Sequence, residues 1–406
     1  MTNSRPAAVI VLAAGEGTRM KSDLPKVLHT IGGRSLLGHA IAAARAVDPL
    51  RLAVVVRHDR DRVAAHVVEC DPTCVIADQD DIKGTGRAVE CGLEALDALD
   101  ETDSGEPELA GTIVVTYGDV PLLAGDTLHA LVRTHEQGAY AVTVVTAYLP
   151  DPTGYGRVIR DSDGQVARIV EQKDASEAER AITEINSGIY AFDSTVLRGA
   201  LRQLTSDNSQ GERYITDVLG IARTAGGSVG AFVLDDVWQC EGVNDKVQLA
   251  RLGAELNRRT VEAVMRGGAI VIDPATTWID ADVSVGTDTV IHPNSQLLGA
   301  TTVGSRASIG PDSTLRDMEV GDEAQLLRTH AELSVVGPGA VVGPWVHLRP
   351  GSDVGADAQV GSFSELRNAE TAAGAVVPPL SVLGSTPTGT VVRATGDAVP
   401  GPGSPS

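Results

Sequence analysis

Basic residues and glycines share one short stretch near the start of the chain. Gly15 and Gly17 stand in a turn that follows the apolar run 7–12, and Arg19 and Lys26 come directly after the turn. The apolar run is typical of a buried parallel strand. Small residues let a ligand approach the backbone, and the exposed N–H groups of such a turn suit a phosphate. The stretch therefore predicts a site for a nucleoside triphosphate.

Two other phosphate-binding motifs do not fit this stretch. A P-loop needs Gly-x4-Gly-Lys followed by Ser or Thr, and the chain has no such sequence here. A Rossmann fingerprint needs a third glycine, but Met20 stands at that position. For Gly15 and Gly17 alone, a glycine-rich turn with solvated charges is an equally good interpretation.

Polar or small residues follow three predicted strands directly. Strands are predicted at 7–12, 52–56, 74–77 and 112–116, and helices at 35–47, 84–99 and 124–137. This alternation is typical of an α/β domain with a mostly parallel sheet. Gly15, Gln79 and Asp119 each come just after a strand, and ligands bind at the carboxyl ends of strands in such sheets. We expect the three residues to face one crevice.

Two of these strand ends carry side chains with specific chemistry. Gln79 can both donate and accept, as a uracil edge requires, and Gly84 and Thr85 open a helix with free N–H groups. Asp119 supplies a carboxylate for a hard cation such as Mg²⁺, which takes one or two protein carboxylates plus phosphate oxygens. The alternatives are a surface glutamine at an ordinary helix start and an Asx-turn before Pro121.

The composition restricts the class of protein. The chain has 406 residues and a formal net charge of -21, and the length corresponds to roughly two to three domains. A nucleic-acid-binding surface needs a basic patch, so this charge argues against one. The four cysteines form no Cys-x-x-Cys pair, and we find neither a signal peptide nor an apolar run of membrane-spanning length. We expect reduced thiols, no membrane insertion and a cytoplasmic protein.

The first stretch resembles a known signature. Leu12-x-x-Gly-x-Gly-Thr-Arg-Met20 followed by Pro25-Lys26 is similar to the signature of sugar-1-phosphate nucleotidyltransferases. The best match is the bifunctional GlmU type, in which a UDP-N-acetylglucosamine pyrophosphorylase is fused to a glucosamine-1-phosphate acetyltransferase. The resemblance implies a reaction of UTP with N-acetylglucosamine 1-phosphate, dependent on Mg²⁺, that serves cell-envelope precursor synthesis.

The resemblance also implies roles for individual residues. It assigns charge stabilisation to Arg19 and Lys26, and metal binding to Asp119 and Asn244. The implied nucleotide-binding residues are Leu12, Ala13, Ala14, Gly15, Gln79, Gly84 and Thr85. The implied sugar-binding residues are Tyr117, Gly118, Gly156, Glu171 and Asn186.

Two of these positions, and Arg87 in addition, carry an open question. Asn244 begins a predicted helix, so its alternative role is an N-cap. Glu171 lies in a region of short predicted strands, where a solvated charge on a hairpin is the alternative; those strands are predicted at 141–147, 157–161, 166–171 and 188–192. Arg87 stands where the family usually has His, and this departure could change nucleotide affinity.

Aliphatic residues recur every six positions in the second half of the chain. The first series is Ile279, Val285, Ile291, Leu297, Val303, Ile309 and Leu315. After a slip in register, the second is Val336, Val342, Leu348, Val354, Val360 and Leu366. This period predicts a β-helix. The hexads resemble the left-handed parallel β-helix of hexapeptide acyltransferases, which usually trimerise, so a homotrimer is expected if this shorter helix still assembles.

The acetyltransferase part departs from the family pattern. Arg349 still matches a family position, but the family's lysine is Arg367 here. Pro379 stands where the catalytic histidine is expected, and Val382 stands where a tyrosine is expected. Loss of a general base costs roughly 10²–10⁴-fold in rate. We also expect the coils that carry the acetyl-CoA contacts to be missing, and therefore no acetyltransferase activity.

These observations predict a domain order and a function. The domains are a nucleotidyltransferase over 1–243, a linker helix over 244–268, a truncated β-helix over 269–384 and a disordered tail over 385–406. The predicted function is formation of UDP-N-acetylglucosamine and pyrophosphate. Three alternatives stay open: the same chemistry with another nucleotide or with another sugar or cyclitol phosphate, a non-catalytic scaffold, and a bifunctional enzyme that keeps its acetyltransferase.

Overall fold

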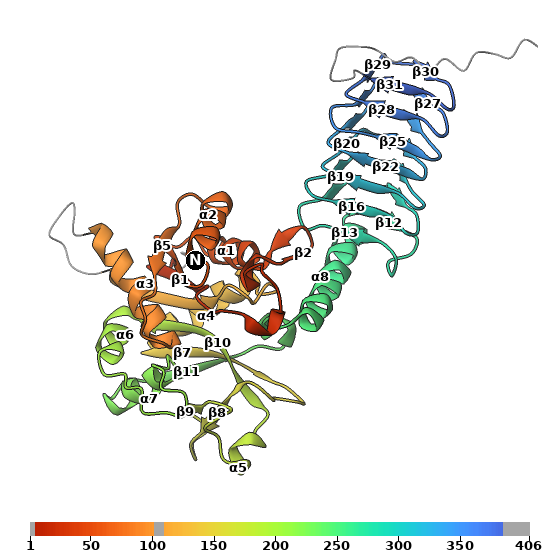
Figure 1. The fold of residues 1–406 in the computed structure, drawn as a ribbon. Coiled ribbons are helices and arrows are strands. Elements are labelled where there is room, and N and C mark those ends of the chain that lie inside the picture. The colour runs from red at the N-terminus through yellow and green to blue at the C-terminus, as the bar shows by residue number, and fades with distance from the viewer. Residues whose placement is uncertain (1–4, 101–108, 385–406) are drawn as a thin grey trace, which may run out of the picture. The chain divides into compact units, whose positions relative to one another are not determined.

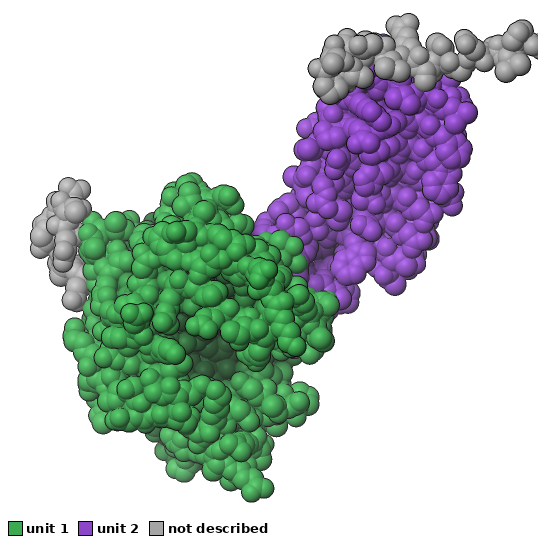
Figure 2. All heavy atoms as spheres, viewed as in Figure 1, with its two compact units in different colours: residues 1–30, 35–252 green, residues 31–34, 253–406 purple. Residues whose placement is uncertain are grey.

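The structure is a computed structural model, and it describes residues 5–100 and 109–384. The chain divides into two compact units, which Figure 2 colours separately. The first unit comprises residues 1–30 and 35–252, and the second unit comprises residues 31–34 and 253–406. Every residue predicted to bind nucleotide, sugar or metal belongs to the first unit.

The units divide inside a helix. The boundary falls between Leu252 and Gly253, within α8 (Lys246–Arg266), whereas the sequence predicts a boundary at 243 and a linker helix over 244–268. The helix itself was predicted to within two residues at each end. The predicted tail over 385–406 lies outside the described residues.

A mostly parallel sheet forms the centre of the first unit (Figure 1). Its main strand order in the described residues is β11-β7-β10-β6-β1-β4-β5, and β8 and β9 continue from β10. The strands are β1 (Ala8–Leu12), β4 (Arg51–Val56), β5 (Val75–Asp78), β6 (Thr112–Tyr117), β7 (Val142–Tyr148), β8 (Gly156–Arg160), β9 (Val166–Val170), β10 (Glu184–Asp193) and β11 (Val229–Val233). β10 runs antiparallel to both β6 and β7. β10 is longer than the strand predicted at 188–192, because the prediction missed its first half.

Helices cover both faces of this sheet. They are α1 (Leu36–Ala46), α2 (Arg60–Cys70), α3 (Thr85–Asp100), α4 (Gly125–Gln137), α5 (Glu177–Arg180), α6 (Ser194–Leu201) and α7 (Asp217–Thr224). Alternate residues of β1 enter different cores: Ile10 packs with residues of α3 and α6, and Val9 and Val11 pack with residues of α1 and α4. Burial on both faces is the physical reason for the apolar run, and it confirms the predicted α/β class.

Short turns and helices complete the first half. The 3-10 helices are η1 (Thr18–Met20), η2 (Lys26–Leu28) and η3 (Val237–Cys240), and a two-stranded ribbon consists of β2 (Thr30–Ile31) and β3 (Arg34–Ser35). The four cysteines are free thiols. Within the described residues, none of the helices combines the length and apolar character needed to cross a bilayer.

Three parallel sheets form most of the described part of the second unit, which also includes the C-terminal part of α8. The first sheet contains β12 (Ile270–Val271), β15 (Val290–Ile291), β18 (Ser308–Ile309), β21 (Gln325–Leu326), β24 (Val341–Val342), β27 (Gln359–Val360) and β30 (Val376–Val377). The second contains β13 (Trp278–Ile279), β16 (Gln296–Leu298), β19 (Thr314–Arg316), β22 (Thr329–Glu332), β25 (Val346–Leu348), β28 (Glu365–Arg367) and β31 (Val382–Gly384). The third contains β14 (Ser284–Val285), β17 (Thr302–Val303), β20 (Glu319–Val320), β23 (Val335–Val336), β26 (Asp353–Val354) and β29 (Glu370–Thr371). Each coil gives one strand to each sheet, except that the last described coil gives β30 and β31 only, and this is the arrangement of the left-handed β-helix that the sequence predicts (Figure 1).

The structure explains the slip in the six-residue period. Leu315 is followed by inward-facing residues at Val320, Leu326 and Ala331 before the second series begins at Val336. Three of these four steps are five residues long, so the period shortens while the ladder continues: Leu315 pairs with Ala331, and Val320 pairs with Val336. All five side chains are almost fully buried in one core. The slip is therefore a set of shorter turns and not an interruption of the β-helix.

Candidate functional site

Two cavities of the described first unit lie side by side and share Tyr117 and Asp119. The larger encloses about 500 Å³, and all seven residues predicted to bind nucleotide line it: Leu12, Ala13, Ala14, Gly15, Gln79, Gly84 and Thr85. Lys26 also lines this cavity, and Arg19 and Asn244 line the smaller one. The expectation that the strand ends after β1, β5 and β6 meet at one crevice is confirmed. We name these the nucleotide cavity and the sugar cavity after the predicted roles of their residues.

The glycine-rich turn packs against Lys26, and both line the nucleotide cavity. Gly17 has a φ of +62° and precedes η1. A side-chain carbon at this position would lie 2.5 Å from Cβ of Lys26, so the close approach requires glycine. Met20, which is almost fully buried, holds the end of η1 in the core. The turn is therefore anchored at Gly17 and Met20, while Gly15, Thr18 and Arg19 remain exposed.

Lys26 forms an ion pair with Asp119. The side chains are only 13% and 17% exposed, which protects the pair from solvent screening. Asp119 is held by its own backbone, because its carbonyl accepts a 2.9 Å hydrogen bond from the N–H of Val243. A side-chain carbon at Gly242 would lie 3.8 Å from the Asp119 carboxylate. The Val243 hydrogen bond therefore holds the segment that carries Asn244 beside Asp119.

Asn244 is bound to Arg19. Its side-chain oxygen accepts a 2.8 Å hydrogen bond from the guanidinium of Arg19. The helix is capped by the next residue, since Asp245 accepts from the backbone N–H groups of Val247 and Gln248 at 2.9 and 2.8 Å. The alternative interpretation of Asn244 as the N-cap is therefore wrong. Its side chain remains at the sugar cavity.

The donor set of Asp119 and Asn244 fits a small hard cation. A carboxylate and an amide oxygen line the same cavity, and Mg²⁺ completes such a set with phosphate oxygens and water. Among the described residues, no three His, Cys, Asp or Glu side chains are grouped closely enough to hold a metal on their own. A metal held by Asp119 and Asn244 would therefore take its remaining ligands from phosphate oxygens and water.

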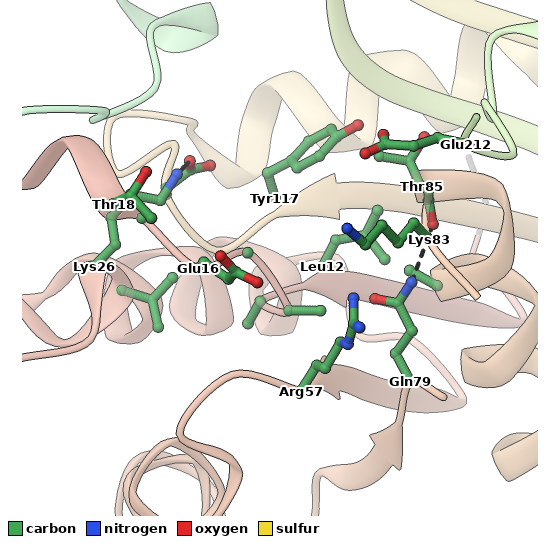
Figure 3. Close-up of a pocket in the computed structure, with 18 residues that line it drawn as sticks. Leu12, Glu16, Thr18, Lys26, Arg57, Gln79, Lys83, Thr85, Tyr117 and Glu212 are labelled. Atoms are coloured by element: carbon green, nitrogen blue, oxygen red, sulfur yellow. Dashed lines mark hydrogen bonds and ion pairs between the residues drawn. The ribbon is translucent and has the colours of Figure 1, made fainter. Parts of the chain in front are cut away.

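Gln79 presents a hydrogen-bond acceptor, and not a donor, to the nucleotide cavity. Its side-chain nitrogen donates to the carbonyls of Ile82 and Gly84 at 3.0 and 3.2 Å. Its carbonyl oxygen points into the cavity, and Arg57 and Lys83 lie on the same side (Figure 3). Sequence analysis missed both cations. Arg57 follows the strand predicted at 52–56, so the rule that identified Gln79 and Asp119 could have found it.

The helix start beside Gln79 is packed against another segment. Gly84 has a φ of +116°, and a side chain there would clash with the backbone of Arg213. The N–H of Gly86 donates to the carbonyl of Arg213 at 2.8 Å, and Thr85 accepts from the N–H of Ile215 at 3.1 Å. These contacts place Glu212, which the sequence analysis also missed, in the lining of the cavity (Figure 3).

The predicted sugar residues are divided among three environments. Tyr117, Gly156 and Asn186 line the sugar cavity. Gly118 is buried, and its N–H donates to the carbonyl of Leu12 at 2.9 Å, so its visible role is to join two strand ends. Glu171 lines a separate hollow, together with Asp174 and Asp217. The lining residues of this hollow are Arg168, Ile169, Val170, Glu171, Asp174, Asp207, Asn208, Tyr214, Thr216, Asp217 and Gly220.

Glu171 nevertheless lies close to the sugar cavity. A side-chain carbon at Gly156 would be 3.5 Å from a carboxylate oxygen of Glu171. Burial, and then the negative charges of Asp174 and Asp217, raise the pKa of the Glu171 carboxyl. A solvated hairpin charge would have neither feature, so that alternative interpretation is wrong.

Arg87 does not line either cavity. Its guanidinium pairs with Asp80, Glu90 and Glu94 at 2.9, 2.8 and 2.9 Å. These partners raise its pKa, so it stays charged throughout the accessible pH range. Any effect of Arg87 on nucleotide affinity is therefore exerted through the Asp80 segment next to Gln79.

Comparison with known proteins supports both halves of this description. Residues 9–216 match the MobA-like NTP transferase domain family. A protein of Pseudarthrobacter chlorophenolicus named "Bifunctional protein GlmU" is 58% identical over 382 residues, which are 94% of this chain and 76% of the relative. Relatives of the same name from Paenarthrobacter aurescens and Corynebacterium glutamicum are 58% and 51% identical, over 93% of this chain and 75% and 77% of their own length.

Proposed function

The chain belongs to the GlmU family and is a nucleotidyltransferase, and from this premise we propose its substrates. It transfers a uridylyl group from UTP to N-acetylglucosamine 1-phosphate, which yields UDP-N-acetylglucosamine and pyrophosphate for cell-envelope precursors. The observation that supports this best is the union of seven predicted nucleotide residues in one cavity that shares Asp119 with a second. One reacting group can occupy each cavity, with the shared carboxylate between them.

The polarity of the nucleotide cavity supports uracil as the base. The edge of uracil offers an acceptor, an N–H donor and a second acceptor. Gln79 offers a carbonyl oxygen, because its nitrogen is engaged by Ile82 and Gly84. Arg57 and Lys83 offer donors in the same cavity. Cytosine has an acceptor at the central position, which would leave the Gln79 oxygen without a donor. A buried acceptor without a partner costs about 1–3 kcal/mol.

The reaction needs positioning and charge neutralisation. An oxygen of the sugar phosphate attacks the α-phosphorus of UTP in line, one P–O bond forms, and the bond to the leaving pyrophosphate breaks. We assign Lys26, which lines the nucleotide cavity, to the α-phosphate or the sugar phosphate, and Arg19, which lines the sugar cavity, to charge on the leaving group. Mg²⁺, held by Asp119 and Asn244, would neutralise phosphate charge when bound. In the free protein Lys26 and Arg19 are paired with these same two residues, which keeps both cations in place.

We further propose that the second unit has no acetyltransferase activity. Pro379 occupies the position of the expected general base and has no titratable side chain. Arg349 and Arg367 both bind the carboxylate of Glu365, and the Arg367 contact measures 2.7 Å. Acetyl-CoA consumption with glucosamine 1-phosphate tests this point, and turnover there would show a bifunctional enzyme. A homotrimer through the second unit and a cytoplasmic location also remain predictions.

A substrate panel tests the proposed reaction. The four ribonucleoside triphosphates are each combined with Mg²⁺ and with N-acetylglucosamine, glucose, glucosamine or a cyclitol phosphate, and pyrophosphate release is measured. The proposal predicts the highest kcat/KM for UTP with N-acetylglucosamine 1-phosphate. If another pair of nucleotide and sugar phosphate gives the highest kcat/KM, the reaction type stands and the proposed substrates are wrong. No release with any pair would contradict the proposal.

A further inference from the structure

A β-bulge interrupts β10 at the edge of the sugar cavity. The pairing of β10 with β7 shifts between Asn186 and Tyr190. Gly188 lies inside the bulge with a φ of +84°, and a side chain there would approach the ring of Tyr117 to 2.5 Å. In a regular strand, residues four apart are separated by about 13 Å. The bulge shortens this span, so two side chains of one strand can meet.

The hydrogen bonds of Asn186 fix the direction of its amide group. Its Oδ1 accepts from the backbone N–H of Gly188 at 3.0 Å and from the hydroxyl of Tyr190 at 2.9 Å. A backbone N–H can only donate, so the atom that it meets must be the amide oxygen. Both lone pairs of this oxygen are then in use. The amide nitrogen, with its two N–H donors, is left for the cavity that Asn186 lines.

Tyr190 is itself held rigidly. The residue is fully buried, and its ring packs against Phe192 with a centroid distance of 5.4 Å. Burial also raises the pKa of its hydroxyl, which therefore stays protonated and able to donate. Sequence analysis gave Tyr190 no role, because an aromatic residue in a buried strand reads as part of the core.

We propose that Tyr190 is a positioning residue for sugar recognition, because its hydroxyl holds Asn186 with the amide N–H groups toward the sugar cavity. The site then selects sugar phosphates that present an oxygen acceptor to this amide, such as the carbonyl of an N-acyl group. Asn186 makes the contact, and Tyr190 acts through it. This inference rests on the proposed function for the identity of the sugar phosphate.

Tyr190→Phe removes the hydroxyl and leaves the ring. Loss of one hydrogen bond between neutral groups should raise the KM for N-acetylglucosamine 1-phosphate about 3- to 10-fold, with the KM for UTP unchanged. Tyr148→Phe is the matched control. Tyr148 lies on the neighbouring strand β7, outside both cavities, and its hydroxyl donates to Glu184 at 3.3 Å. An equal rise in both substrate KM values, or none, would overturn the proposal.

A double-mutant cycle separates positioning from simple packing. If Tyr190 acts through Asn186, Tyr190→Phe should change the sugar-phosphate KM by no more than about twofold in an Asn186→Ala background. A full additional effect in that background would assign Tyr190 a different role and overturn the proposal.

The amide can also be observed without substrates. In protein labelled with ¹⁵N-asparagine, the side-chain NH₂ signals of Asn186 should move in Tyr190→Phe and stay in place in Tyr148→Phe. This result would stand even if the enzyme used another sugar phosphate, so a failure of the proposed function is distinguishable. Unmoved signals would overturn the inference, while wild-type protein without turnover would contradict only the proposed function.

Discussion

The two units use polar side chains in different ways. In the first unit, polar side chains from separate segments pair with one another around the cavities, as Lys26 of η2 does with Asp119, which follows β6. In the second unit, buried hydroxyls bond to backbone carbonyls at turns, as Ser295 does with His292 at 2.7 Å and Ser352 with Arg349 at 2.7 Å. The first arrangement leaves groups that a ligand can recruit, and the second closes the coils. Changes to the paired groups at the cavities of the first unit should therefore affect chemistry most, and changes in the core of the second unit should affect stability most.

The largest effect is expected at Asp119, one of the two residues shared by the two cavities. Asp119→Ala removes a proposed metal ligand and leaves Lys26 without its carboxylate, so turnover should fall by at least about 10²–10³-fold. Pyrophosphate release measures the loss, and a thermal melt should show that the unit remains folded. Asp126→Ala, at an exposed position in the first turn of α4, is the matched control. Unchanged turnover in Asp119→Ala would reject the metal assignment.

A core change in the second unit should separate stability from activity. Leu348→Ala empties a fully buried position in β25 and should destabilise the β-helix by about 2–5 kcal/mol. Denaturation followed by circular dichroism measures the change. Val335→Ala, at an outward-facing position in β23, should have a much smaller effect. A parallel fall in uridylyl transfer by Leu348→Ala would break the comparison between the units.

A smaller effect is expected at Arg57, where a substitution tests how the nucleotide cavity selects its base. Arg57→Ala removes a donor from the nucleotide cavity, so the preference for UTP over CTP should fall about 10-fold. The ratio of kcat/KM values for the two nucleotides is the measurement. Arg51→Ala is the control, because Arg51 is exposed at the start of β4, whereas Arg57 follows the end of β4. An unchanged ratio would leave base selection to Gln79 and the backbone.

The smallest effect concerns pH. Burial raises the folded-state pKa of Glu171 above its ordinary value of 4.5. The negative charges of Asp174, Asp217 and Glu212 raise this pKa further, and a hydrogen bond from Thr216 opposes the shift. The folded state then holds this proton more tightly than the unfolded state, so stability falls as pH rises from 4.5 through the raised pKa. Glu171→Gln should flatten this part of the curve of unfolding free energy against pH. A curve with the same slope would place the pH dependence elsewhere, for example at Asp217, whose pKa burial also raises.

Much of the fold could be predicted because each unit repeats a simple pattern. The alternation of apolar runs and helical segments predicts the sheet of the first unit, and the six-residue period predicts the coils of the second. The five-residue steps around Val320 and Ala331 could not be predicted, because a shorter turn changes the period without changing which residues face inward. The first half of β10 was missed because Asn186, Ser187 and Gly188 are typical of a loop, whereas here they form a bulge.

The site was predicted where a motif or a strand end marks the residue. Gly15, Gln79 and Asp119 follow apolar runs, and the structure brings them to one cavity. Lys83 was missed because a single charged residue in a polar segment carries no pattern. Tyr190 was missed for the opposite reason, since its chemistry depends on a backbone irregularity that only the folded strand reveals.

Pyrophosphate release from UTP, Mg²⁺ and N-acetylglucosamine 1-phosphate tests the central claim most directly. The account predicts steady release by the purified protein, with UDP-N-acetylglucosamine formed in equal amount. A folded sample that releases no pyrophosphate from this mixture would contradict the proposed substrates.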